Sequence, residues 1–288
     1  MRRLLVAFGL LASISGAAAG EYELPPTLRG AEAAVPGASP CCPRWSGFYG
    51  GGQVSHSSMT ADFGRGVGDL AGFIVRNSIL EAPVSSWTTL SAATSNGFGF
   101  GGFFGYNSQW EELILGWELN YVHTSVSARS RDSLTRTLAN DAGAPPGHHF
   151  VYDVTVSGEA SIRITDVLMW RGRAGWTVGN FLPYAFLAPG IVRADVTRAA
   201  TVASVRTDVP DVTDPVTPPL PVDFFGPLSN TDTKIGGYYF AYAAGIGLDV
   251  EIMPRVFARL EYEALSIPNI KDMKVSVQTL RTGLGLKF

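Results

Sequence analysis

The nine residues from Leu280 to Phe288 read LRTGLGLKF and alternate strictly between two kinds of side chain. One set is apolar apart from a threonine and ends on the aromatic Phe288, whereas the other consists of Arg281, two glycines and Lys287. Successive side chains of a β-strand point to opposite faces. The segment therefore predicts a strand with one apolar face and one charged or small face.

Three further segments, Leu113–Tyr121, Met169–Trp176 and Val256–Glu263, alternate in the same way. If the apolar faces contact lipid, the charged faces must point into the interior of a barrel. The lumen of a small barrel is filled by side chains, so charges inside it have to be paired. We therefore predict a salt-bridge network in the lumen, formed by Glu118, Arg171, Arg173, Arg259, Glu261, Glu263 and Arg281.

The composition agrees with a membrane barrel. Hydrophobic residues make up 46% of the chain and charged residues only 16%, yet beyond residue 20 no apolar run is long enough for a membrane helix. A strand barrel meets both conditions, because alternate residues face lipid. The net charge of −3 argues against a nucleic-acid surface. Aromatic residues that flank the strands predict interfacial girdles; they are Trp110, Trp176, Tyr184, Tyr238 and Tyr262.

The whole pattern predicts an all-β fold, an eight-stranded antiparallel transmembrane up-and-down β-barrel over residues 45–288. Its candidate strands are Trp45–His56, Gly97–Asn107, Leu113–Val126, Gly158–Val178, Pro183–Thr197, Gly237–Ile252, Arg255–Ser266 and Lys274–Phe288. Tight and longer connections alternate between them, and three of the longer ones have thirty or more residues. We expect these three long loops, 59–95, 127–157 and 198–236, to be extracellular, and the tight turns and both termini to be periplasmic.

The N-terminal region predicts export. Residues 1–19 combine two arginines, a short apolar core and a run of alanines, which is typical of a cleaved signal peptide. Residues 20–44 are rich in proline and alanine and predict a periplasmic linker. Cys41 and Cys42 are adjacent, so an ordinary bridge between them is excluded, and no role is predicted for them. The expected location is the outer membrane.

Several segments resemble the small porin-like outer-membrane immunogen family of Gram-negative bacteria. They are WSGFYGGGQ from Trp45, GGFFGYNSQW from Gly101, LGWELNY from Leu115, WRGRAGWTVGNFLPYAFLAPG from Trp170 and the ending RTGLGLKF. The resemblance implies an OmpA-like eight-stranded barrel, with Phe288 as the signal read by the barrel-assembly machinery. Pro189 departs from the family, because it would remove a ladder hydrogen bond within a strand.

The leading functional hypothesis is a non-enzymatic barrel that contributes to envelope structure and displays surface loops. Adhesion or contact with an extracellular partner would use loops 59–95 and 198–236, the latter acidic and rich in proline. Outer-membrane lipid and lipopolysaccharide are the expected surroundings. A passive small-solute porin is the first alternative, although eight strands rarely leave a hydrated path.

Two sharper alternatives involve histidines. His123 and Ser125 lie on one strand face, and with Glu159 they resemble the catalytic set of lipid A acyl hydrolases, although the alternation puts Glu159 on the inward face. His148 and His149 in the second long loop are candidate ligands for haem iron. No zinc spacing, phosphate loop or nucleotide fingerprint occurs, so we predict no catalytic residues, no metal site and no cofactor.

Overall fold

The computed structural model describes residues 45–211 and 220–288, which belong to one compact unit. The predicted signal peptide at 1–19, the predicted linker at 20–44 and the two cysteines lie outside these residues. None of the helices in the described ranges is long and apolar enough to span a membrane.

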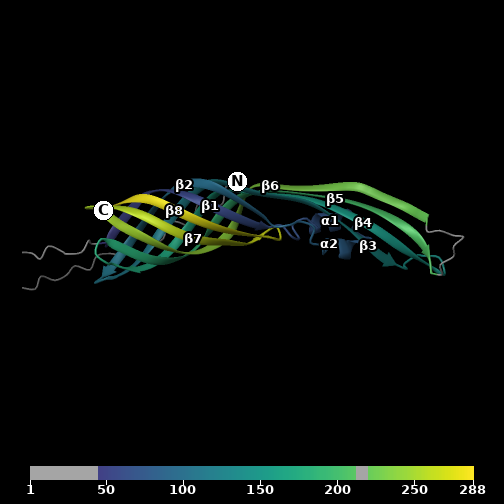
Figure 1. Ribbon diagram of the computed structural model, residues 1–288, viewed down its shortest axis with the longest axis horizontal. Helices are drawn as coiled ribbons and strands as arrows, with labels where there is room; N and C mark the ends of the chain where they lie inside the picture. Colours follow the sequence, from purple (N-terminus) through teal and green to yellow (C-terminus); the bar gives the residue numbers. More distant parts are fainter. Residues whose placement is uncertain (1–44, 212–219) are drawn as a thin grey trace, which may run out of the picture. The chain divides into compact units, whose positions relative to one another are not determined.

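Eight strands form a closed barrel in which each strand pairs with its sequence neighbours (Figure 1). They are β1 (Gly47–Asp62), β2 (Ala93–Trp110), β3 (Leu113–Asn140), β4 (His148–Trp176), β5 (Phe181–Pro210), β6 (Leu220–Met253), β7 (Val256–Ile270) and β8 (Met273–Lys287). All pairs are antiparallel, and β1 closes the ring on β8 from Tyr49–Lys287 to Asp62–Lys274. The predicted eight-stranded up-and-down barrel is confirmed.

Large apolar side chains cover the outward face of the barrel. Examples are Leu115, Leu119, Trp170, Leu187, Ile246 and Leu284, each between 43% and 70% exposed. A polar cluster ends this belt at the barrel end away from Phe288. There the Tyr121 hydroxyl donates to Asp166 over 2.7 Å, and His123 Nδ1 contacts the same carboxylate at 3.0 Å. An apolar outward belt with polar edges is the surface that a lipid bilayer requires.

Four strands continue far beyond the belt, which corrects the predicted loops. Most of 127–157 and 198–236 is strand, because β3 and β4 are paired out to Asn140–Phe150, and β5 and β6 out to Asp208–Leu220. We call these ends of β3, β4, β5 and β6 the distal sheet; it comprises residues 125–140, 148–164, 194–210 and 220–237. Valine and threonine recur in the distal sheet among polar residues. These β-branched side chains favour strand structure even though the outward face of the sheet is exposed to solvent.

The first long connection does lie between strands, but it is shorter than predicted and contains two helices. Residues 63–92, here called the helical insert, hold α1 (Gly68–Ile74) and α2 (Glu81–Ser85). The helices lie beside the distal sheet (Figure 1), and α1 contacts β5 and β6. Apolar side chains of both parts form one buried cluster, which includes Val67, Leu70, Val84, Trp87, Leu90, Val154, Val156, Ile162, Ala200 and Val202. The helical insert and the distal sheet therefore share a buried apolar core, which is continuous with the apolar residues of the barrel interior.

A register shift around Thr165 changes the face on which residues of β4 lie. Met169, Arg171 and Arg173 point inward on one side of the shift, whereas Ile164 and Ile162 point inward on the other. A bulge of one residue exchanges the two faces of a strand. Glu159 consequently faces outward and pairs with Arg129, so its predicted inward placement is wrong.

Pro189 interrupts the β4–β5 ladder locally, as predicted from its missing N–H. Pairing between β4 and β5 is interrupted there, between Met169–Gly190 and Gly172–Leu187, while the register on either side is unchanged. Proline has no N–H to donate to the ladder. The strand tolerates this single interruption because its pairing with β6, Pro189 opposite Tyr242, continues.

We expect glycine to be required at Gly101 and dispensable at Gly172. A Cβ added at Gly101 would overlap the carbonyl oxygen of Tyr121 on the neighbouring strand, whereas one at Gly172 would meet no atom within 4 Å. Gly101→Ala should therefore lower the free energy of unfolding by about 1–3 kcal/mol. Gly172→Ala should change it by less than about 0.5 kcal/mol. Urea unfolding in lipid vesicles measures both, and equal effects would contradict the close strand approach.

Candidate functional site

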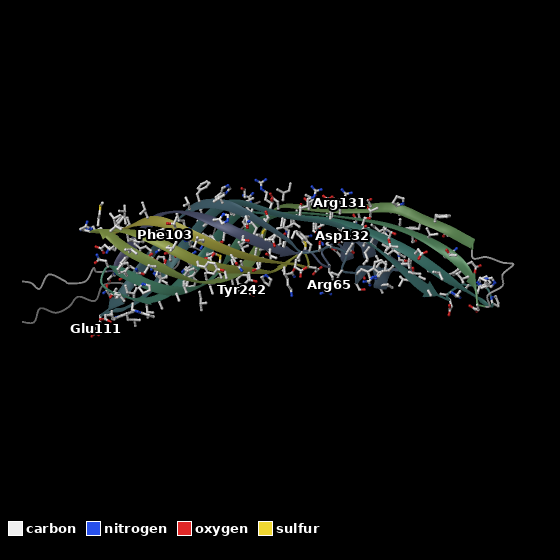
Figure 2. The ribbon with its side chains drawn as sticks, viewed as in Figure 1. Arg65, Phe103, Glu111, Arg131, Asp132 and Tyr242 are labelled. Carbon is white, nitrogen blue, oxygen red and sulfur yellow. The ribbon has the colours of Figure 1, made fainter. Side chains whose placement is uncertain are left out.

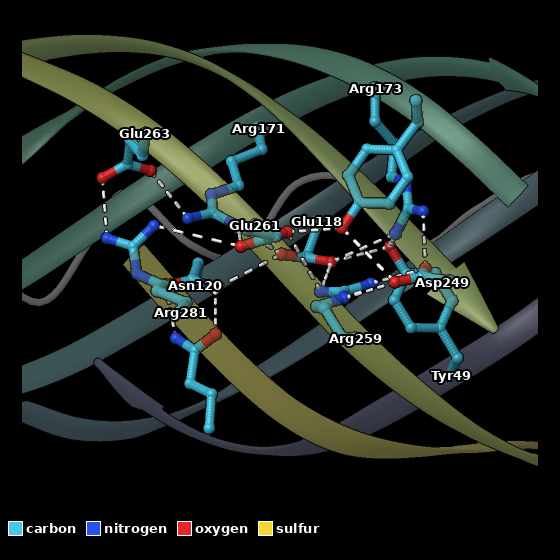
Figure 3. Close-up of polar contacts among 12 residues, drawn as sticks. Tyr49, Glu118, Asn120, Arg171, Arg173, Asp249, Arg259, Glu261, Glu263 and Arg281 are labelled. Atoms are coloured by element: carbon cyan, nitrogen blue, oxygen red, sulfur yellow. Dashed lines mark hydrogen bonds and ion pairs between the residues drawn. The ribbon is translucent and has the colours of Figure 1, made fainter. Parts of the chain in front are cut away.

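The structure places all seven residues of the predicted network in the lumen, each at most 4% exposed (Figure 3). It also brings in Asp249 of β6, which sequence reasoning missed. The buried network of the described lumen thus has four arginines against four carboxylates: Arg171, Arg173, Arg259 and Arg281, and Glu118, Asp249, Glu261 and Glu263. Equal numbers of opposite charges are what a dry interior tolerates.

Glu118 is the centre of the network. Its carboxylate accepts hydrogen bonds from Arg259 Nη1 at 2.6 Å, from Arg171 Nη1 at 3.0 Å and from the Tyr49 hydroxyl at 3.0 Å. Arg259 also donates to both oxygens of Asp249, over 2.8 and 3.0 Å. Such forked contacts fix a guanidinium in one orientation. The charges of β3, β6 and β7 are thereby held in one arrangement.

A second group lies nearer the distal sheet. Arg171 Nη2 and Arg281 Nη2 both contact Glu263, at 2.7 and 2.6 Å, and Arg171 also contacts Glu261 at 2.9 Å. This group joins β4, β7 and β8. Since β3 and β6 enter through Glu118 and Asp249, the network crosses the barrel rather than following one wall.

Aromatic rings fill the space between the charged groups. Arg173 lies 3.7 Å above the Tyr184 ring and Arg259 lies 3.9 Å above the Phe103 ring. Tyr184 is 6% exposed and donates to Glu261 over 2.6 Å, so its predicted place in an interfacial girdle is wrong. The other four predicted girdle residues do lie outward, between 46% and 70% exposed. Tyr184 lies on the same strand face as the buried Leu182 and Phe186, a period-two signal that would have placed it inside.

Beside this network the lumen has little free space. A cavity of about 20 Å³, lined by Ser55, Thr124, Thr279 and Arg281 among others, has room for roughly one water molecule. Beyond it the lumen is closed by apolar side chains, which include Met59, Phe63, Ile267 and Ile270. The described part of the lumen therefore lacks a continuous wide path.

A separate polar group, here called the anchor cluster, attaches the helical insert to the distal sheet. Arg198 of β5 is 2% exposed, and it donates to the Gly66 carbonyl at 2.8 Å and to Asp69 at 3.0 and 3.1 Å. It also donates to Asp232 at 2.6 Å, which accepts a further hydrogen bond from Lys271 at 3.1 Å. One guanidinium thus joins the insert, β5, β6 and the β7–β8 turn.

The anchor cluster predicts an acid-sensitive attachment. Hydrogen bonds from Arg198 and then Lys271 hold the pKa of Asp232 below its usual range. A lowered folded pKa stabilises the attachment above the unfolded value of about 3.9, and this contribution is lost as pH falls through the folded pKa. Hydrogen exchange of 68–85, corrected for intrinsic rates, should therefore be constant from pH 7 to 5 and rise below about pH 4.

The control for this pH dependence is Asp232→Asn. The variant should exchange faster than the natural chain already at pH 7, and it should respond less to acid, because the titrating carboxylate is gone. An unchanged acid response in the variant would assign the effect to other groups.

The candidate histidines do not form the predicted sites. His148 and His149 are adjacent in β4 and therefore point to opposite faces, so they are not brought together on one ligand. Their Nδ1 atoms contact Asp208 at 2.8 Å and Asp211 at 2.9 Å. His123 contacts Asp166 rather than Glu159.

No group of three or more histidine, cysteine, aspartate or glutamate side chains suited to a metal ion occurs in residues 45–211 and 220–288. The buried arginines of these ranges belong to the lumen network and the anchor cluster.

Comparison with known proteins agrees with this geometry. The model of the outer membrane protein beta-barrel domain family matches residues 33–288. No curated protein matches the sequence significantly. Solved structures with a similar fold include Neisserial surface protein A, at 15% identity over 84% of this chain and 98% of that chain, with a TM-score of 0.32.

Two other solved structures are similar at comparable levels. Ail of Yersinia pestis, solved with the heparin analogue sucrose octasulfate, has 10% identity over 83% of this chain and 99% of that chain, with a TM-score of 0.30. The translocator domain of NalP from Neisseria meningitidis has 11% identity over 84% of this chain and 89% of that chain, with a TM-score of 0.26. The family match covers most of the chain and implies an outer-membrane location. With its closed antiparallel barrel and outward apolar belt, the chain belongs to the outer membrane protein beta-barrel family.

Proposed function

We propose that this protein is a non-conducting, non-enzymatic outer-membrane barrel that holds the distal sheet at the cell surface for adhesion or contact with another protein. The observation that carries the proposal is the distal sheet itself, four paired strands with a buried core beyond the apolar belt. A segment of this size needs sustained pairing and burial to stay ordered. A barrel whose only task were to span the membrane would not need it.

The proposed orientation follows from the connections. Three tight turns, at Glu111-Glu112, at 177–180 and at Pro254-Arg255, lie at the barrel end that holds Phe288, and a fourth, at Lys271-Asp272, lies at the opposite end beside the anchor cluster. Outer-membrane barrels have short turns on the periplasmic side and longer segments outside. We therefore propose periplasmic termini, with the distal sheet and helical insert extracellular. In Figure 2 Glu111 lies at the end with these turns, whereas Arg131 and Asp132 lie near the middle of the long axis, in the first part of the distal sheet.

The distal sheet offers two open edges for a protein partner. Pairing of β2 with β3 ends at Gly99–Thr124, and pairing of β6 with β7 ends at Tyr242–Ser266. Beyond these points one edge of β3 and one edge of β6 lack a neighbouring strand. An open edge presents unpaired N–H and C=O groups that a strand of another protein can join. Charged residues along β3, such as Arg129, Arg131 and Asp132, disfavour unspecific pairing of copies.

The lumen supports the non-conducting part of the proposal. A porin needs a hydrated path, whereas here eight charged side chains are buried and paired across the barrel, with aromatic rings between them. Recording from single channels in planar bilayers should therefore give no steady conductance. A stable conductance step would reject the closed lumen and favour a small-solute porin.

Surface labelling tests the proposed orientation in the membrane, and an adhesion assay tests the proposed role of the distal sheet. In a Cys41→Ser, Cys42→Ser background, Arg131→Cys should react with an impermeant maleimide on intact cells, whereas Glu111→Cys should react only after lysis. Cells that carry the full barrel should adhere to host-matrix-coated surfaces, and cells with a barrel shortened by residues 127–157 and 198–236 should not. Reversed labelling would reject the orientation, and equal adhesion would reject the role of the distal sheet.

A further inference from the structure

A cavity of about 230 Å³ lies between the helical insert and the distal sheet, apart from the lumen network. The end of α1 and the segment that follows it form one side, and β4, β5 and β6 form the other. Drug-sized sites occupy roughly 300–1,000 Å³. The space is therefore suited to a compound of about one ring or a short alkyl chain.

The wall of this cavity is largely apolar. Val75 and Leu80 of the insert are buried at 4% and 6% exposure, and Phe225 of β6 lies opposite, 37% exposed. Tyr152 of β4 completes this side. A polar ligand would leave water against these apolar side chains, whereas a ring or an alkyl group would displace it. The cavity therefore favours ligands that contain a ring or an alkyl group.

The polar part of the cavity is dominated by Arg206 of β5. Its guanidinium lies 4.6 Å above the Phe150 ring, which fixes its plane. Its Nε is buried and has no hydrogen-bond partner, and its nearest carboxylate, Asp223, is 3.9 Å away, at the edge of ion-pair range. The side chain as a whole is 32% exposed, so its terminal N–H groups, rather than Nε, are the donors that a ligand oxygen in the cavity would meet.

The charges that line the cavity favour an anion. Arg76, stacked on Phe73 at 4.4 Å, adds a second guanidinium at the cavity, while Asp223 is the one carboxylate among the described lining residues. Two positive charges against one negative charge leave the site with a net charge of +1. The hydroxyl of Ser204, a residue 8% exposed, adds a neutral donor beside Arg206.

We propose that this cavity binds a small organic monocarboxylate, with the carboxylate on Arg206 and the ring or alkyl group against Val75, Leu80 and Phe225. Guanidinium and carboxylate match in shape and charge. This site is distinct from the sheet edges proposed for protein contact, and binding in vitro does not depend on which side of the membrane the site faces.

The test uses the full chain in lipid nanodiscs and 4-fluorobenzoate as the probe, observed by fluorine NMR. Saturable binding is expected, and Arg206→Gln should weaken it at least tenfold. The matched control is Arg136→Gln, because Arg136 of β3 contacts the Trp87 ring of the same insert but does not line the cavity. The Arg136→Gln variant should bind 4-fluorobenzoate with the same affinity as the natural chain. The neutral analogue 4-fluorobenzyl alcohol should bind at least tenfold more weakly than the carboxylate.

A second variant separates binding from folding. Asp223→Asn removes the carboxylate that competes for Arg206, so 4-fluorobenzoate should bind severalfold more tightly. A merely structural role of the Arg206–Asp223 contact would weaken binding in both variants. Equal affinities for acid and alcohol, or unchanged binding in Arg206→Gln, would show that the probe partitions into lipid and would overturn the proposal.

Discussion

Arg259→Leu is expected to lower the free energy of unfolding by about 3–5 kcal/mol, the usual cost of removing one partner of a buried ion pair. Arg259 is 2% exposed and contacts both Glu118 and Asp249, at 2.6 and 2.8 Å. Leucine would leave three arginines against four carboxylates in a region with little room for water. The remaining negative charge would stay buried without a counter-charge, which is the main source of the cost.

Urea unfolding in lipid vesicles measures this loss against two controls. Arg131→Leu changes an exposed arginine of the distal sheet and should cost less than about 0.5 kcal/mol. The double variant Arg259→Leu, Glu118→Leu leaves equal numbers of positive and negative charges in the lumen. Its loss in free energy of unfolding should therefore be smaller, by at least about 1 kcal/mol, than the sum of the losses in the two single variants. Additive losses would mean that the two charges do not interact and that the lumen is hydrated.

The barrel could be predicted from sequence because its physical cause is periodic. Lipid on one side and a narrow interior on the other force an alternation that is visible in β3, β7 and β8. Asp249 was not predicted, because its neighbours in β6 are glycine, alanine and leucine, and the alternation of apolar and polar side chains is weak there. It lies directly opposite Arg259 in the β6–β7 register, so counting across the tight turn at Pro254 would have found it.

The distal sheet could not be predicted by the same means. Outside the membrane the outward face is in water, so threonine, serine and charged residues occupy it, and the segment resembles a loop. The bulge at Thr165 adds a second difficulty, because alternation counted from Trp176 assigns Glu159 to the wrong face. Pairing with neighbouring strands decides both features, and pairing is a property of the fold rather than of one segment.

The polar sites outside the lumen depend on contacts distant in sequence. Arg198 meets Asp69 only because the helical insert folds back onto β5, and Arg206 meets Asp223 across two strands. No spacing in the sequence relates these residues. The converse holds for His148 and His149, which are neighbours in sequence but point to opposite faces of β4.

Arg198→Met is expected to release the helical insert from the distal sheet while the barrel stays folded. The insert is attached to β5 through the apolar core and through Arg198, the buried guanidinium that reaches Gly66 and Asp69. Loss of these charge-assisted hydrogen bonds should lower the protection of 68–85 against hydrogen exchange about tenfold to a hundredfold, or roughly 1.4–2.8 kcal/mol of opening free energy. The effect is smaller than in the lumen, because Asp69 and Asp232 are partly exposed and can be rehydrated.

Arg193→Met is the matched control on the same strand. Arg193 lies on the outward face of β5, about half exposed, and approaches Asp166 only to 3.7 Å, so its loss should leave exchange of the insert unchanged. Exchange of β7 and β8 amides within the apolar belt should stay slow in both variants. If Arg198→Met accelerates exchange in those strands as well, the insert and the barrel unfold as one unit, and the prediction of a separate release is wrong. If it accelerates neither, the apolar core alone holds the insert in place.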